Sequence, residues 1–304
     1  MLTNNVQEYH ELNLDREDQK VDNLFQGTLK HLQILDLSAF YQVVDDLTMQ
    51  NLCFNHLSSQ SLTLYHLTEI SLNHCYKITD NGIQWLIGSC HSPKITKLDL
   101  SNTYLTGNCF LRKMPHLSFL SLNCCYNLNS KGLESISMTC QNLKYFSISQ
   151  CKQISDVDLI SGFKIGFRNL QEFHANYTNL SGNCFECFES FESLRKLSLT
   201  FCSKIRENSK LAEFLSKCQN LTYLDLSETK INGKIFQSLT FSPKLKFLFA
   251  DLCPNLEFDI PDSLKVRFFS HIGTKLRPNF DSPEVENYLR KLAKQRGLNA
   301  RVKK

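Results

Sequence analysis

The sequence predicts an α/β solenoid, in which short repeats stack into a curved parallel sheet with helices outside it. An apolar triple spaced L-x-x-L-x-L recurs along the 304 residues. From Leu67 onward its copies begin 19 to 28 residues apart, and a helical pattern follows several of them. A unit of about 25 residues cannot bury its own apolar side, so neighbouring units must cover one another. This period is typical of leucine-rich repeats, and it predicts a horseshoe with the sheet on its concave face.

The clearest unit runs from Leu67 to Cys90. Its Leu67, Ile70 and Leu72 alternate as in a short strand with one buried face. Thr79 is a suitable N-cap for the helical pattern that follows. The other triples begin at Tyr9, Leu32, Ile95, Leu117, Leu143, Leu170, Leu194, Leu221, Leu245 and, in a degenerate form that puts Arg267 at an inward position, Leu264. Eleven copies therefore predict one repeat domain over residues 1–270.

The repeat spacing is irregular at one place and the repeats are of two kinds. The 35 residues between Leu32 and Leu67 predict an inserted loop near Asp45 to Ser61. One kind of repeat has a cysteine after the strand and another at the end of the helix. The second kind has threonine in place of the first cysteine and a shorter convex side. The pairs of the first kind are Cys75 and Cys90, Cys125 and Cys140, and Cys202 and Cys218; the threonines are Thr103, Thr178 and Thr229.

The motifs LNHCYKITDNGIQWLIGSC and LNCCYNLNSKGLESISMTC resemble the cysteine-containing leucine-rich repeats of F-box/LRR substrate receptors and their F-box-less relatives. The resemblance covers about residues 9 to 270. It implies a part in substrate selection for ubiquitination. Because the repeats begin by Tyr9 and leave no room for an F-box, we expect any ligase adaptor to be engaged through another chain.

Thirteen cysteines suggest a disulfide framework at first sight, but most fall at fixed buried positions of the repeat. There a thiol behaves as a small apolar group. The N-terminus lacks a signal-peptide pattern, and no run of 18 apolar residues predicts a membrane span. We therefore expect reduced thiols and a cytoplasmic, or else nuclear, protein. Cys184 and Cys187 form a single CxxC without a partner motif, so no metal site is predicted.

The segment 271–304 differs from the repeats, because it carries nine Lys or Arg against three acidic residues, a net charge of 9 − 3 = +6. The whole chain is +4, so the repeats carry 4 − 6 = −2, and no nucleic-acid groove is predicted. Ser282 and Pro283 open a helical pattern that Gly297 ends. We interpret it as a capping helix with a basic tail; the alternative is contact with an anionic membrane or an acidic partner.

No enzyme signature is present: the sequence lacks a phosphate-binding glycine loop, a dinucleotide fingerprint, H-E-x-x-H and G-x-S-x-G. We predict a non-enzymatic protein without a cofactor. An unrecognised Cys–His site remains a weaker alternative.

Function should then lie on the concave face, to which the residues between the inward leucines point. Eleven strands about 4.8 Å apart give a surface on the order of 50 Å long, enough for a standard protein interface. Outward aromatic residues grouped on adjacent strands are typical binding anchors. The predicted contact residues are Glu69, Asp99, Phe119, Tyr145, Tyr223, Phe247, Phe249 and Phe268. The first hypothesis is a protein-binding scaffold. The alternative is a stand-alone inhibitor or host-directed effector that occupies its target.

Overall fold

The protein, seen in a computed structural model, is an open arc of stacked repeats. The structure describes residues 11–13, 32–53, 66–88, 94–187, 192–206, 209–256, 264, 266 and 268–271. Eleven parallel strands follow one another in chain order in one sheet. They are β1 (Glu11–Asn13), β2 (Ile34–Asp36), β3 (Glu69–Ser71), β4 (Lys97–Asp99), β5 (Phe119–Ser121), β6 (Tyr145–Ser147), β7 (Glu172–His174), β8 (Lys196–Ser198), β9 (Tyr223–Asp225), β10 (Phe247–Phe249) and β11 (Phe268–Ser270).

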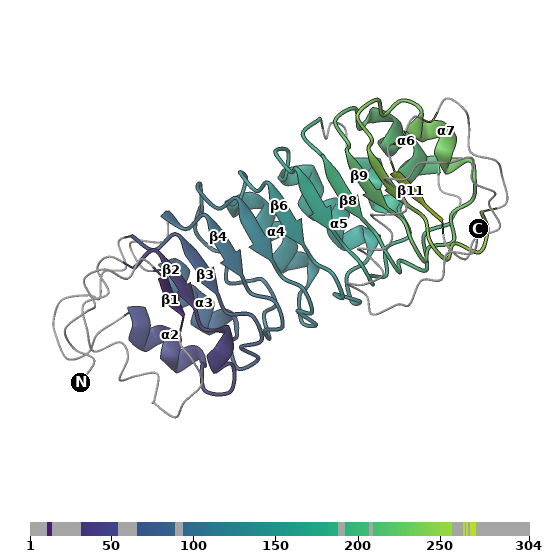
Figure 1. Ribbon diagram of the computed structural model, residues 1–304. Coiled ribbons are helices and arrows are strands. Elements are labelled where there is room, and N and C mark those ends of the chain that lie inside the picture. Colours follow the sequence, from purple (N-terminus) through teal and green to yellow (C-terminus); the bar gives the residue numbers. More distant parts are fainter. Residues whose placement is uncertain are drawn as a thin grey trace.

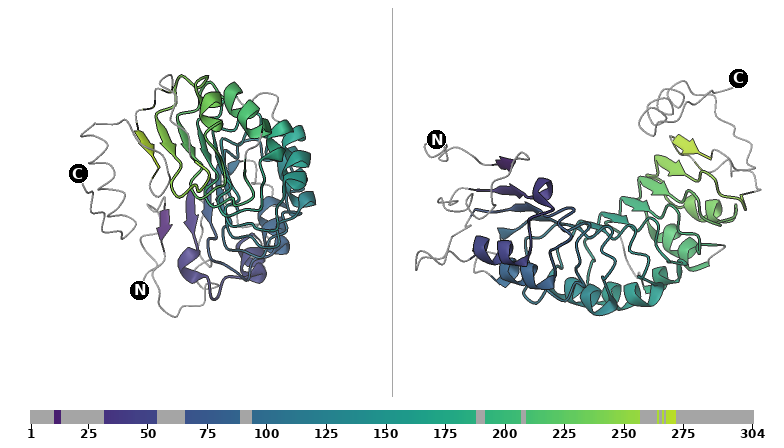
Figure 2. Two further views of the ribbon diagram at one scale, coloured as in Figure 1. Left: turned by 90° about the vertical axis from the view of Figure 1, so that its right-hand side faces the viewer. Right: turned by 90° about the horizontal axis from the view of Figure 1, so that it is seen from below.

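The strands line the inner side of the arc and the helices cover its outer side (Figure 1; Figure 2, right). The helices are α2 (Asp46–Cys53), α3 (Asp80–Gly88), α4 (Ser130–Thr139), α5 (Asp156–Ile165), α6 (Ser209–Lys217) and the short α7 (Ile235–Leu239), with 3-10 turns η1 (Ser38–Phe40) and η3 (Asn183–Cys187). The predicted α/β leucine-rich-repeat horseshoe is confirmed. Thr79 caps α3 as expected, since its Oγ1 accepts a hydrogen bond from the Asn81 N–H at 3.2 Å.

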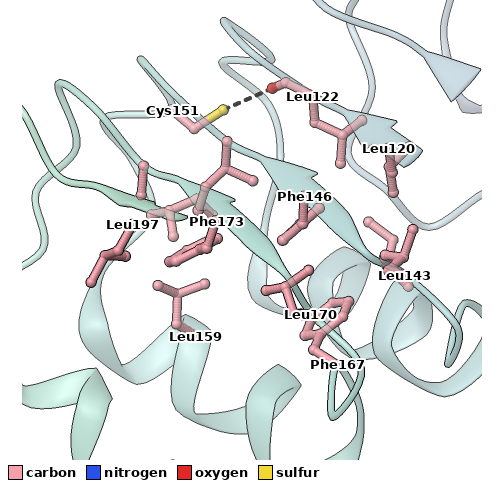
Figure 3. Packing of buried hydrophobic residues seen from close by; sticks show 14 of the residues in the cluster. Leu120, Leu122, Leu143, Phe146, Cys151, Leu159, Phe167, Leu170, Phe173 and Leu197 are labelled. Carbon is pink, nitrogen blue, oxygen red and sulfur yellow. Dashed lines mark hydrogen bonds between the residues drawn. The ribbon is translucent and has the colours of Figure 1, made fainter. Parts of the chain in front are cut away.

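The core is a single apolar layer between sheet and helices, built from the inward residues of every repeat (Figure 3). The cysteines after the strands belong to it. Cys151, for example, is fully buried and donates its S–H to the carbonyl oxygen of Leu122 in the preceding repeat, with Sγ and O 3.1 Å apart. Cys125 and Cys202 make the same bond to Leu100 and Ala175. Each of these carbonyl oxygens also accepts a hydrogen bond within its own turn, so the thiol is a second donor that links neighbouring repeats.

The two kinds of repeat differ in the side chain that follows the strand and in the carbonyl oxygen to which it donates. In the threonine kind, Thr103 donates its hydroxyl to the carbonyl oxygen of Leu100 in its own repeat, at 2.6 Å. Cys125 of the next repeat reaches the same oxygen at 3.2 Å. The convex side of these repeats is short, as predicted: no helix lies between β4 and β5, and only η3 or α7 follows Thr178 or Thr229.

The loop expected near Asp45 to Ser61 was wrong in its first part. Residues 46–53 form α2, because Asp45 and Thr48 hydrogen-bond each other reciprocally at its start, and Met49 and Leu52 are buried. The rest of the expected insertion, residues 54–61, lies outside the described residues, as does the predicted capping helix.

The register of the last repeat is two residues further along than predicted. Leu248 pairs with Phe269, and Phe269 is 5% exposed. Phe269 and Val266 thus take the inward positions for which the sequence offered Arg267 and Leu264. An aromatic ring at the central inward position avoids the cost of burying a guanidinium.

Candidate functional site: the concave face

A pair of stacked aromatic rings occupies the centre of the concave face. Phe119 of β5 and Tyr145 of β6 come from paired positions of neighbouring strands. Their ring centroids are 4.1 Å apart and their planes lie within 9° of parallel. Both side chains are half-buried, so each keeps a surface towards solvent. We call these two rings the aromatic platform.

Charged residues flank the aromatic platform on both sides, and each finds a partner on a neighbouring strand. On one side Lys97 lies 3.3 Å from Glu69, and its Nζ is 5.4 Å from the centroid of Phe119. On the other side Lys196 pairs with Glu172 at 2.9 Å. Across the six adjacent strands β3 to β8, two ion pairs therefore stand on either side of the aromatic rings. Surface pairs of this kind contribute little stability but fix side-chain positions.

His174 completes the platform on the side of β7, with its ring 5.2 Å from that of Tyr145. Burial lowers the pKa of His174, although the carboxylate of Glu172, 3.7 Å from Nε2, acts in the opposite direction. The imidazole is therefore neutral at pH 7. Its Nε2 atom makes no hydrogen bond within the described residues. Burial likewise raises the pKa of the Tyr145 phenol, so this ring is also uncharged.

The late strands carry the other predicted aromatic residues, and here the prediction needs a correction. Tyr223 and Phe247 are half-buried and belong to paired positions of β9 and β10. Phe249 is only 5% exposed, so it offers no free ring surface. It is not part of the core cluster, and its ring lies 5.3 Å from that of Tyr223.

The backbone of Phe268 pairs with Phe247, whereas the predicted register would have matched it with Phe249. Its side chain lies outside the described residues. Among the described side chains, the late strands thus present two half-buried aromatic rings, Tyr223 and Phe247. The central strands present Phe119 and Tyr145.

Asp99 is half-buried, and its carboxylate accepts a hydrogen bond from the Ser101 N–H at 3.0 Å. Asp36 and Asp225 do the same for the residues two positions on. Part of the role of Asp99 is thus to hold the turn after its strand. Asn176, two residues after the end of β7, acts in a similar way, because its side-chain oxygen accepts from both the Ser198 hydroxyl and the Thr200 N–H.

The sequence interpretation missed a second group of exposed rings, on the turns that follow the strands. Tyr76, Tyr104 and Tyr126 are 41%, 56% and 60% exposed. Tyr41 lies one repeat earlier, 6.0 Å from Tyr76. Each of these residues stands nine positions after the first leucine or isoleucine of its repeat, and that spacing was the signal that could have revealed them. They border the concave face at the carboxyl ends of its strands.

The chemistry of the buried thiols argues against nucleophilic catalysis. All twelve cysteines that the structure describes are free, and ten of them are buried. Burial raises the pKa of Cys53 and of Cys218 to about 12, so their reactive thiolate forms are not populated near pH 7. Within the described ranges, no group of three His, Cys, Asp or Glu side chains could hold a metal ion, and no helix is long and apolar enough to cross a membrane.

Comparisons with known proteins agree with this architecture. A family model described as "Leucine Rich repeat" matches residues 217–239. Among solved structures, a chain in the crystal structure of the yeast Rad7 and Elc1 complex is similar, with a TM-score of 0.51 and 16% identity, over 78% of this chain and 67% of that one. At this identity the similarity supports the fold. No curated protein matches the sequence significantly.

Proposed function

We propose that this chain is a non-enzymatic scaffold that holds a protein partner on its concave face. The observation that carries the proposal is the aromatic platform, because Phe119 and Tyr145 present ring surface between charge pairs that are already neutralised. Such rings bury well against a partner at small entropic cost, and hot spots are enriched in aromatic residues. Tyr223 and Phe247 extend the contact along the arc, and Glu69 and Asp99 border it. Phe268 remains a predicted contact.

The finer proposal is that the partner is a substrate to be selected for ubiquitin-dependent degradation in the cytoplasm or nucleus, with the ligase adaptor engaged through another chain. The resemblance of the cysteine-containing repeats to F-box/LRR receptors supports this role. The fold similarity to a protein solved together with Elc1 is compatible with it. The free thiols suit a reducing compartment.

Co-purification from a eukaryotic lysate tests the proposal. The full chain should retain a stoichiometric protein, and the variant carrying Phe119→Ala and Tyr145→Ala should lose it, with ~2 kcal/mol or more for each anchor. The matched control carries Tyr104→Ala and Tyr126→Ala, which removes two exposed rings from the turns beside the concave face and leaves the platform intact. Equal retention by the platform variant and the wild type would refute the proposed face.

The same experiment distinguishes the finer role from simple inhibition. Cullin-type ligase components in the eluate, lost in parallel with the partner, support substrate selection. A single target without ligase components supports a stand-alone inhibitor or effector that acts by occupancy.

A further inference from the structure

A second surface lies along the edge of the sheet where the strands begin, and it is strongly basic. It consists of the described segments 94–96, 112–118, 141–144, 168–171, 192–195, 219–222 and 243–246, which lead into β4 to β10. We call it the amino edge. Its exposed basic residues are Lys94, Arg112, Lys113, Lys144, Arg168, Arg195, Lys244 and Lys246. Against these eight stands one acidic residue, Glu192, so its net charge is 8 − 1 = +7.

Among the residues that the structure describes, no carboxylate forms an ion pair with the basic residues of the amino edge, in contrast to the concave face. Lys97 and Lys196 on the concave face each pair with a glutamate. By contrast, none of the eight basic side chains of the edge makes an ion pair with a described carboxylate; Lys244 instead donates to the side-chain oxygen of Asn220. Uncompensated charge of one sign along a rim attracts a partner of the opposite sign.

The edge has a regular spacing, because backbone hydrogen bonds run from each rung to the next. Gln171 N–H donates to Lys144, Arg195 to Gln171, Thr222 to Arg195 and Lys246 to Thr222, at 2.7 to 2.9 Å. Lys144, Arg195 and Lys246 therefore stand on alternate rungs. With strands about 4.8 Å apart, successive basic residues lie roughly 9.6 Å apart. A polyproline II chain rises about 9.3 Å in three residues, so an acidic residue at every third position of such a chain would meet Lys144, Arg195 and Lys246 in turn.

A polar depression lies along the segments that lead into β5 to β8. Its volume is about 430 Å³, and Lys144, His116, Asn142, Asn169, Gln171 and Ser193 are among the residues that line it. Amide and hydroxyl groups of this kind can hydrogen-bond the backbone or a polar side chain of a peptide.

From these observations we propose that the amino edge binds an acidic polypeptide segment of another protein in an extended, polyproline-like conformation. The chain's own segment 271–304 is an unsuitable occupant, because its charge of +6 has the same sign. Single-stranded nucleic acid is disfavoured, since the seven segments contain no Phe, Tyr or Trp on which bases could stack. The proposal does not depend on the concave face.

Fluorescence anisotropy with the full chain and a labelled (Glu-Pro-Pro)6 peptide tests this proposal. We expect saturable binding that weakens as salt is raised from 50 to 200 mM, because exposed charges are screened. A peptide of the same composition with its glutamates in one block, and (Lys-Pro-Pro)6, should bind more weakly. Blocked and spaced glutamates binding equally would overturn the geometric part of the proposal. Tighter binding of a DNA duplex than of the peptide would overturn the choice of partner.

The decisive variant carries Lys144→Gln, Arg195→Gln and Lys246→Gln. Its affinity for the peptide should fall by about tenfold, because three exposed charge pairs are lost together. The matched control carries Lys152→Gln, Lys204→Gln and Lys230→Gln, three exposed lysines on the turns at the opposite edge, with the same change in net charge. An equal loss in both variants would show that net charge alone binds the peptide, and would overturn the site. All six side chains are exposed, so both variants should keep the wild-type urea midpoint. Single Arg195→Gln, with a smaller loss, serves if the triple variant unfolds.

Discussion

The ring of Phe119 lies flat against that of Tyr145, with centroids 4.1 Å apart and planes 9° from parallel. Because the two residues come from paired positions of adjacent strands, the sheet itself sets this stack. A partner would therefore meet two rings whose orientation is already defined, and little side-chain entropy would be lost on binding.

The stack should be measurable without any partner. Phe119→Ala and Tyr145→Ala, alone and together, should show a coupling of about 0.5–1.5 kcal/mol in the free energy of unfolding, the range for aromatic pairs beyond their area burial. Urea denaturation followed by circular dichroism gives the three differences. As a control, Phe119→Ala and Tyr223→Ala on β5 and β9 should add within about 0.5 kcal/mol. A coupling near zero for the stacked pair would contradict the geometry.

The sequence predicts the inward residues of most repeats, but not the register of the last repeat or the burial of Phe249. The leucine period reports burial directly, so the nine triples from the one at Leu32 to the one at Leu245 are buried where the sequence puts them. Before β11, Leu264 and Val266 are both apolar, so two frames compete, and both put Phe269 at an inward position. The observed register gives Phe269 the central one. In the same way, alternation correctly keeps Phe249 out of the core cluster, but it says nothing of crowding on a curved face.

The net charge of the repeats hides a local feature for a related reason. The sum of −2 over residues 1–270 hides a rim of +7, because lysines and arginines recur just before the strands while the acidic residues lie elsewhere in the repeat. Only the register of the repeats, read position by position, separates the two sets.

Thiol reactivity should divide the cysteines sharply. Cys124 and Cys187 are partly exposed, whereas Cys125 and Cys140 are buried. Burial raises the pKa of Cys140 to about 12, and it raises that of Cys125 to about 11 even though Thr103 hydrogen-bonds to it. Brief alkylation at pH 8, mapped by mass spectrometry, should therefore label the first pair and spare the second. Labelling at Cys140 before Cys124 would contradict the described burial.

The bond between Cys151 and Leu122 should contribute to stability. Cys151→Ala removes a fully buried sulfur atom and leaves the carbonyl oxygen of Leu122 without its 3.1 Å partner. We expect a loss of about 1–3 kcal/mol in the free energy of unfolding. Cys187→Ala, at a partly exposed position, should change stability by less than about 0.5 kcal/mol. Equal effects of the two substitutions would argue against the inter-repeat bond.

Asp156 should make stability depend on acid pH. Burial alone would raise its pKa, but hydrogen bonds from Cys184 and Ser181 outweigh this and hold the pKa below its ordinary value. The folded state therefore binds fewer protons than the unfolded state around pH 4. The resulting stabilisation is present above the unfolded pKa near 3.9 and is lost as pH falls through the lower folded value.

Asp156→Asn should thus cost about 1–3 kcal/mol at pH 7, since charge-assisted hydrogen bonds are weakened, and the cost should shrink below about pH 4. Urea midpoints between pH 7 and pH 3 measure both. The control Glu192→Gln, at an exposed position, should follow the wild-type curve. A difference between Asp156→Asn and wild type that stays constant over this range would rule out the carboxylate as its cause.

Neighbouring repeats approach each other closely at Gly132 of α4, and alanine there should be severely destabilising. A Cβ atom would lie 2.0 Å from the carbonyl oxygen of Thr106 and 2.8 Å from the Cα of Gly107. Gly107 itself has φ of 89°, so that backbone cannot easily move to make room. We expect Gly132→Ala to lower the free energy of unfolding, measured by urea denaturation, by about 2–3 kcal/mol or more.

Gly88→Ala is the matched control, because its Cβ would meet nothing within 4 Å. At the end of α3 the same substitution should be neutral or stabilise by up to about 1 kcal/mol. Both substitutions restrict the unfolded chain equally, so the difference between their effects on the free energy of unfolding isolates the contact between neighbouring repeats. Similar effects of the two would mean that the turn at Thr106 does not lie against α4.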